Sequence, residues 1–173
     1  MEPATRPGDE ARPEPVLVSA CLLGRRCRYD GVHNRDGVLE DTLAAAGLAP
    51  VAFCPEEAGG LGTPRPPAWI EAGGAEAVLD GAARVVRDDG VDVTAGFVRG
   101  AEGALAVCLA RGIRRAFLKE RSPSCGCAAT HVGGTLVPGP GVTAALLRRH
   151  GVVCEGVEGR RPSPGSAPDP VAP

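Results

Sequence analysis

The segment PVLVSAC, residues 15–21, is a short apolar run that ends in a cysteine. Its length and its β-branched residues predict a strand over residues 15–20 that is buried on both faces. Strands of this kind are typical of parallel sheets that are covered by helices on each side. Cys21 therefore lies directly after the carboxyl end of a predicted buried strand.

The rest of the chain alternates between short apolar runs and helical patterns. Apolar residues recur at helical spacing from Phe97 to Cys108, and Gly112 follows as a stop signal. The predicted strands are residues 15–20, 49–53, 83–87, 114–118 and 152–153, and the predicted helices are residues 38–46, 94–111 and 142–150. This alternation predicts an α/β fold: a single layered domain with a mostly parallel sheet flanked by helices, in a Rossmann-like arrangement.

Length and composition predict one domain between two tails. The 173-residue chain is 43% hydrophobic and 23% charged, which is ordinary for one globular domain. Residues 1–14 and 158–173 are rich in proline and charged residues and have too few apolar side chains to build a core. We therefore expect disordered tails at both ends and a folded domain over residues 15–157.

The charge and the aromatic content favour a small-molecule partner. The net charge is −2 and only 3% of the residues are aromatic, so the chain offers neither a strong positive field nor many rings to stack on bases. Nucleic acid is therefore not the expected partner. No apolar run reaches the ~18 residues of a membrane-spanning helix, and the first residues do not resemble a signal peptide. We expect a cytoplasmic protein without membrane association.

The chain has seven cysteines, and it is expected to be cytoplasmic. An odd number in a reducing compartment indicates a mixture of buried thiols, metal ligands and reactive thiols rather than disulfides. Cys108 lies on the apolar face of its predicted helix and Cys154 ends the last predicted strand, so both are expected in the core. Cys127 follows Cys125 after a glycine that leaves its direction open, and we expect it not to be a ligand.

Three other cysteines follow predicted strands. Cys21, Cys54 and Cys125 come after the strands over residues 15–20, 49–53 and 114–118, and parallel strands place their carboxyl ends at one edge of a sheet. These thiols can therefore converge on one point.

The ligand chemistry at this point stays open from spacing alone. A structural zinc site usually has Cys-x-x-Cys pairs, and this chain has none, since Cys21 and Cys27 are separated by five residues. An iron–sulfur cluster accepts thiolates from scattered glycine-rich loops, and three thiolates on a four-iron cluster would leave one iron open to a substrate. Four unrelated loop thiols are the remaining alternative.

Six segments, in this order, resemble the DUF523 family across nearly all of residues 16–154. They are VSACLLGRRCRYDG (18–31), CPEEAGGLGTPRPP (54–67), VLDGAARVV (78–86), DVTAGFVRGAE (92–102), LKERSPSCG (118–126) and GVTAALLRRHG (141–151). The resemblance implies a non-redox thiouracil desulfidase in which a [4Fe-4S] cluster is held by Cys21, Cys54 and Cys125. Cys27 belongs to the same motif and is assigned no role.

The resemblance also implies that Glu56 and Ser122 are catalytic. Conversion of C=S to C=O in a thiopyrimidine such as 2- or 4-thiouracil needs a water that attacks the carbon, and a carboxylate can take its proton. Ser122 would orient the water or the pyrimidine. The structural alternatives are that Glu56 only caps a loop and that Ser122 only forms a turn with Pro123.

Other polar residues near these loops form a second tier of candidates for binding the pyrimidine: Asp30, Asn34, Lys119 and Glu120. Each could equally tie loop backbone together. The chain also departs from the family pattern at Gly62, at Trp69 and in the segment after Gly126. These departures concern the substrate pocket rather than the cluster.

Two functions of other classes compete with the desulfidase. One is a non-catalytic metal-binding module, and the other is a cluster-free thiol enzyme that carries sulfur as a persulfide on Cys125. The cluster hypothesis requires all three cysteines, whereas the persulfide hypothesis requires only Cys125.

Overall fold

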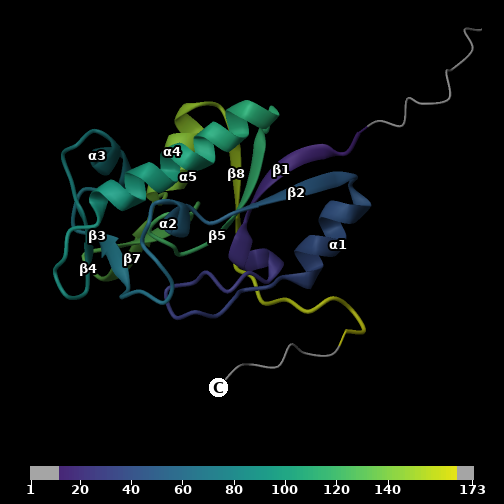
Figure 1. The fold of residues 1–173 in the computed structure, drawn as a ribbon, viewed down its shortest axis with the longest axis horizontal. Coiled ribbons are helices and arrows are strands. Elements are labelled where there is room, and N and C mark those ends of the chain that lie inside the picture. Colours follow the sequence, from purple (N-terminus) through teal and green to yellow (C-terminus); the bar gives the residue numbers. More distant parts are fainter. Residues whose placement is uncertain (1–11, 167–173) are drawn as a thin grey trace, which may run out of the picture.

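The computed structural model describes residues 12–166, and its main sheet is parallel. Residues 1–11 and 167–173, which belong to the two expected tails, lie outside the described part. The sheet has the strand order β2-β1-β5-β8 (Figure 1). Its strands are β1 (Glu14–Ser19), β2 (Leu48–Phe53), β5 (Arg115–Lys119) and β8 (Val153–Val157), all in parallel pairs. This confirms the predicted α/β fold with a mostly parallel sheet.

Strand β1 is buried on both faces, as its sequence predicts. Leu17 packs on one face against α4 (Thr94–Arg111) and α5 (Val142–Arg149), and Val16 and Val18 pack on the other face against α1 (Gly37–Ala45). Side chains alternate between the faces of a strand, so a continuous apolar run serves two cores at once. Complete burial of each side chain contributes about 1.5–3 kcal/mol.

A second, mixed sheet lies at the other end of the molecule and was not predicted. Its strand order is β4-β3-β6-β7, with β3 and β6 parallel and the outer pairs antiparallel. The strands are β3 (Ala68–Ile70), β4 (Val85–Arg87), β6 (Ala129–Val132) and β7 (Thr135–Pro138), and the helix α3 (Ala75–Leu79) lies beside them (Figure 1). The strand predicted over residues 83–87 exists, but it belongs to this sheet.

The short helix α2 (Pro55–Ala58) packs unusually close to α4. A Cβ atom added to Gly100 would collide with the carbonyl oxygen of Pro55, and one added to Gly59 would collide with that of Gly96. Only glycine permits this approach of two backbones. The contact fixes α2, which carries Glu56, against the longest helix of the domain.

The chain after β8 runs back along the domain instead of leaving it. The Gly37 N–H donates to the Arg161 carbonyl at 2.7 Å, and Arg161 Nε donates to Asp36 Oδ2 at 2.8 Å. Composition predicts a disordered tail from residue 158, and within it Arg160 and Arg161 make backbone and side-chain contacts with Asn34, Asp36 and Gly37 that need no apolar residues. Amino-acid composition alone does not predict such contacts.

No helix in residues 12–166 has both the length and the apolar character needed to cross a membrane.

Candidate functional site

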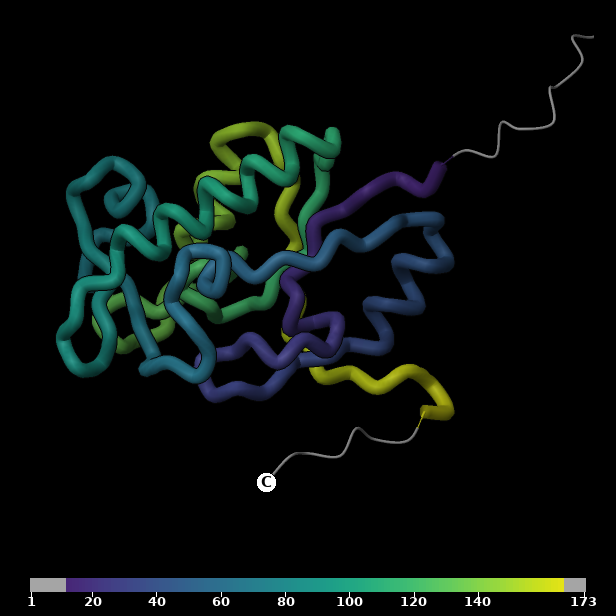
Figure 2. Tube along the Cα trace, viewed as in Figure 1, coloured from purple at the N-terminus to yellow at the C-terminus, as the bar shows by residue number. Residues whose placement is uncertain are grey.

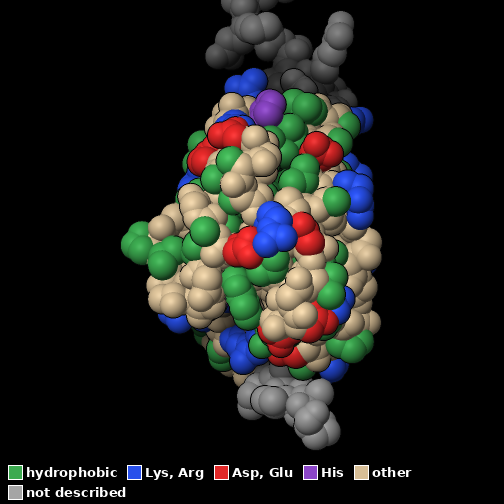
Figure 3. Space-filling view, turned by 90° about the vertical axis from the view of Figure 1, so that its left-hand side faces the viewer, with side chains coloured by type: hydrophobic (Ala, Val, Ile, Leu, Met, Phe, Trp, Pro, Cys, Tyr) green, Lys and Arg blue, Asp and Glu red, His purple; other side chains and the backbone are tan. Residues whose placement is uncertain are grey.

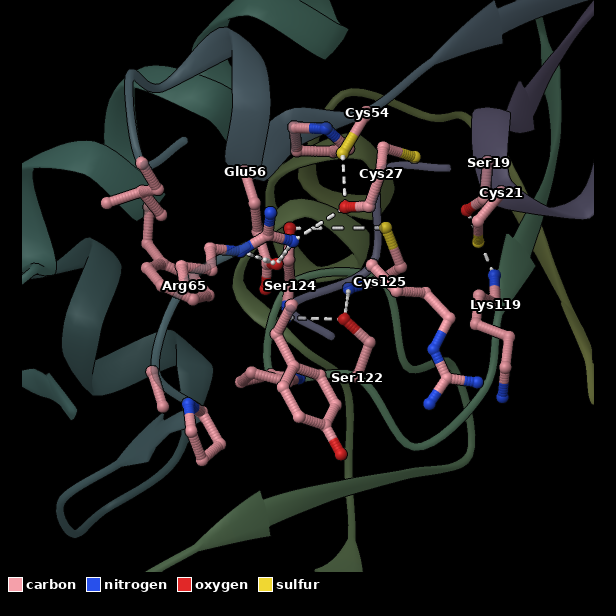
Figure 4. Close-up of a pocket in the computed structure, with 18 of the residues that line it drawn as sticks. Ser19, Cys21, Cys27, Cys54, Glu56, Arg65, Lys119, Ser122, Ser124 and Cys125 are labelled. Carbon is pink, nitrogen blue, oxygen red and sulfur yellow. Dashed lines mark hydrogen bonds and ion pairs between the residues drawn. The ribbon is translucent and has the colours of Figure 1, made fainter. Parts of the chain in front are cut away.

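A cavity of about 470 Å³ opens at the carboxyl ends of β1, β2 and β5. The five residues singled out for chemistry all line it: Cys21, Cys54, Glu56, Ser122 and Cys125. Figure 4 shows the thiols arranged around the cavity, with Glu56 and Arg65 approaching from the side of α2. The structure therefore brings together the three thiols that the strand order predicted to converge.

Each of the three thiols is placed by a different local structure. Cys21 lies in a single 3-10 turn (Ala20–Leu23) that directly follows β1 and ends at Gly24, whose φ of 95° suits glycine. Cys54 occupies the N-cap position of α2, and Pro55 starts the helix. Both cysteines therefore lie within two residues of a strand end.

The turn that carries Cys125 is built by Ser122. Ser122 Oγ accepts hydrogen bonds from the backbone N–H of Ser124 at 3.1 Å and of Cys125 at 3.0 Å. The Gly126 N–H donates to the Ser122 carbonyl at 2.9 Å and closes the turn. The turn role considered for Ser122 is thus present, and its hydroxyl proton stays available to a group in the cavity because Oγ acts only as acceptor in these bonds.

Cys27 lies between Cys21 and Cys54 and also lines the cavity. A hydrogen bond from Cys27 is the main cause that lowers the pKa of Cys21 to about 7, against the opposing effect of burial. The same thiol lowers the pKa of Cys54, while hydrogen bonding to Cys21 raises the pKa of Cys27 itself. Cys27 therefore favours the thiolate form of both neighbouring cysteines, which is the form that binds metal.

Burial dominates at Cys125, where it raises the pKa of the thiol. A coordinated metal deprotonates such a thiol outright. The other cysteines do not line the cavity: Cys108, Cys127 and Cys154 belong to the core beneath α4 and α5. This agrees with the roles expected for Cys108 and Cys154, and it places Cys127 away from the site.

The chemistry of the donor set fits an iron–sulfur cluster. Cys21, Cys54 and Cys125 bring three soft thiol ligands from separate loops to one cavity, as such a cluster allows. In the described range, no group of three or more His, Cys, Asp or Glu side chains is arranged to hold a single metal ion.

Glu56 forms an ion pair with Arg65 inside the cavity. Arg65 Nε donates to Glu56 Oε2 at 2.9 Å, Arg65 Nη2 contacts the same oxygen, and the two side chains are only 15% and 8% exposed. Arg65 Nη2 also donates to the Cys27 carbonyl at 2.9 Å. Sequence reasoning missed Arg65, although a buried carboxylate calls for a basic partner and this arginine lies in the same motif.

The second-tier residues divide into two groups. Asn34 and Lys119 line the cavity, and Asn34 Nδ2 donates to Cys21 Sγ at 3.6 Å. Glu120 also lines it, but its carboxylate accepts from the backbone N–H of Cys127 and of Ala128 and so orders the loop. Asp30 does not line the cavity and pairs with Arg28.

Aromatic side chains form much of the remaining wall. The chain has one Trp, one Tyr and three Phe, and four of these five residues line the cavity: Tyr29, Phe53, Trp69 and Phe97. Flat apolar surfaces favour stacking of a heterocyclic ring. Trp69, one of the departures from the family pattern, thus lies in the pocket, while the Gly62 carbonyl accepts a hydrogen bond from Arg65 Nη1 at 2.7 Å.

The strand ends of this parallel α/β domain surround one cavity with thiols and a carboxylate. These features define the class of protein: an α/β protein with a thiolate site for metal or sulfur chemistry. The model of the 2-thiouracil desulfurase family matches residues 16–156, and the chain belongs to that family.

Two relatives are similar to the chain, and the first of them agrees with this assignment and with the DUF523 resemblance. A solved structure described as the [4Fe-4S]-dependent thiouracil desulfidase TudS (DUF523Vcz) has 50% sequence identity and a TM-score of 0.70, over 83% of this chain and 90% of that chain. The uncharacterized protein YbbK of Bacillus subtilis (strain 168) is 41% identical over 139 residues, which are 79% of this chain and 91% of YbbK.

Proposed function

We propose that this protein is a [4Fe-4S]-dependent desulfidase that removes sulfur from a thiolated pyrimidine such as 2- or 4-thiouracil. The observation that carries the proposal is the convergence of Cys21, Cys54 and Cys125, from three adjacent strand ends, on a cavity that also holds Glu56. The overall reaction is hydrolysis: the C=S compound and water give the C=O compound and hydrogen sulfide. No electrons are gained or lost.

In this proposal Cys21, Cys54 and Cys125 hold the cluster. A cluster bound by three thiolates supplies one iron with an open position, a soft Lewis acid suited to sulfur. Cys27 lines the same cavity and is not a proposed ligand.

Glu56 is the proposed proton acceptor for the attacking water. Both contacts from Arg65 go to Oε2, which fixes the carboxylate and leaves Oε1 to accept the proton. The aromatic wall around Trp69 and Tyr29 would hold the pyrimidine ring flat, and the Ser122 hydroxyl would donate to the ring or to the water.

The end of the molecule that carries the second sheet has a mixed charge. Figure 3 views the end of the molecule that carries the second sheet and shows acidic and basic side chains next to one another. Ion pairs there include Arg84 with Glu71 and Arg149 with both Glu76 and Asp80. This face therefore carries mixed charge and not a continuous basic surface.

Anaerobic reconstitution followed by sulfide release tests the proposal. We expect the wild-type protein to bind about four irons and four inorganic sulfides, with the visible absorption of an iron–sulfur cluster. The loaded protein should release sulfide from 2- or 4-thiouracil and form the matching oxygen compound. An iron-loaded protein without sulfide release would instead support the non-catalytic module, and release by iron-free protein would support the persulfide enzyme.

Substitution of Ser122 by alanine should weaken both the turn and the reaction. Loss of the two hydrogen bonds to Ser124 and Cys125 should lower the free energy of unfolding by about 1–2 kcal/mol. We expect sulfide release to fall by roughly tenfold to a hundredfold, because Cys125 and the substrate lose their alignment. Thermal unfolding and steady-state kinetics measure the two effects.

Ser122→Thr is the matched control because it keeps a hydroxyl at the same place. It should retain most of the stability and activity. If Ser122→Ala lost stability but kept full activity per bound cluster, Ser122 would have a turn role only.

A further inference from the structure

Asn34 is held in one orientation beside Cys21. Its side chain is buried, with 2% exposed, and its Oδ1 accepts from Arg28 Nη1 at 2.6 Å and from Arg160 Nε at 3.1 Å. A guanidinium group can only donate hydrogen bonds, so the atom facing both arginines must be the amide oxygen. The amide nitrogen then faces Cys21 Sγ, at 3.6 Å.

Arg160 reaches Asn34 from the far end of the chain. We call residues 158–163 the C-terminal strap; Figure 2 shows it in yellow, passing below the purple turn after β1 on its way toward α1. The Arg160 backbone N–H also donates to the Asn34 carbonyl at 3.1 Å, and the Asn34 N–H donates to the Cys21 carbonyl at 2.9 Å. Asn34 is therefore fixed between the strap and Cys21.

The strap takes a backbone conformation that its sequence does not favour. Arg160 has φ 64°, in the left-handed region, which is unfavourable for a non-glycine residue. Such strain persists where surrounding contacts enforce it and is concentrated at functional sites. A Cβ atom on the preceding Gly159 would lie only 2.8 Å from the Asn34 carbonyl oxygen, so the backbone of the strap packs directly against Asn34.

We infer that Arg160 is a positioning residue for the cluster: it orients the Asn34 amide so that Nδ2 donates to the sulfur of Cys21. The inference rests on the proposed function, since it takes Cys21 as a cluster ligand. Hydrogen bonds to ligand sulfurs raise the reduction potential of an iron–sulfur cluster and stabilise the ligand. The C-terminal strap thus belongs to the surroundings of the cluster, 126 positions away from Asn34 in the sequence.

Arg160→Gly separates this role from fold stability. Glycine suits the φ of 64°, and this relief offsets the lost hydrogen bond to Asn34, so the variant should unfold at a temperature close to that of the wild type. Its cluster should nevertheless have a more negative midpoint potential and should be lost to an iron chelator roughly tenfold faster. Asn34→Ala should change both cluster properties in the same direction, and Arg160→Lys, which keeps the charge and a donor, should restore much of the wild-type behaviour.

Arg161→Gln controls for the lost charge. It removes one positive charge from the adjacent position and weakens the bond to the buried Asp36, so it should lower stability while leaving the midpoint potential close to that of the wild type. Equal potentials and equal loss rates in cluster-bearing wild type and Arg160→Gly would overturn this inference alone. A wild-type protein that takes up no cluster would overturn the proposed function and this inference with it.

Discussion

Replacement of Cys125 by serine is expected to abolish cluster binding and, with it, sulfide release. A serine hydroxyl keeps its proton near neutral pH and is a hard ligand, so it does not replace a thiolate on iron. The thiol is buried at the end of the turn that Ser122 builds, and Cys21 and Cys54 alone leave two ligands for the cluster. Iron and sulfide content after anaerobic reconstitution, together with the visible spectrum, measure the loss.

Cys127→Ser is the matched control, two residues along the same loop. Cys127 is buried in the core under α5, where burial raises the pKa of its thiol to about 12, and it does not line the cavity. This variant should keep its iron and its activity and lose only some stability, since a hydroxyl replaces a buried thiol. Cys21→Ser and Cys54→Ser should behave like Cys125→Ser. If these two variants kept full activity while Cys125→Ser lost it, the persulfide mechanism would replace the cluster mechanism.

Glu56→Gln should lower kcat for sulfide release by about 10²- to 10⁴-fold, the usual contribution of a positioned general base. The amide has nearly the shape of the carboxylate, and its oxygen can still accept from Arg65, but it does not take a proton from water. Iron content should remain at the wild-type level, because Glu56 is not a proposed ligand. Parallel measurements of iron and kcat separate a chemical defect from loss of the cluster.

The neighbouring Glu57 provides the control for this substitution. Its carboxylate pairs with Arg25 and accepts from Thr63 Oγ1 at 2.8 Å, and Glu57 does not line the cavity. Glu57→Gln makes the same chemical change one residue away and should leave kcat nearly unchanged. If the Glu56→Gln variant kept full activity, Glu56 would serve only as the structural partner of Arg65.

The sequence was informative where one strong physical rule applied. Parallel strands bring their carboxyl ends to one edge, so the positions of Cys21, Cys54 and Cys125 after three apolar runs were enough to predict that they meet. The assignment of Glu56 and Ser122 came from family resemblance, and their roles stay predictions.

Most of the features that were not predicted have no local signal. Strands β3, β6 and β7 have only three or four residues each, too few for a clear period of two. The ion pair of Arg65 with Glu56 depends on how a proline-rich loop folds back over α2. The C-terminal strap is held by arginine side chains and backbone groups, which hydrophobic patterns do not report.

The two sheets contribute different parts of the cavity. The proposed ligands and Glu56 all follow strands of the parallel sheet, and α2 is pinned to α4 by glycines that leave no room for displacement. Trp69, in contrast, comes from β3 of the mixed sheet. A substitution of Trp69 on β3 would therefore change one part of the aromatic wall without altering the strands and helix that carry the three thiols and Glu56.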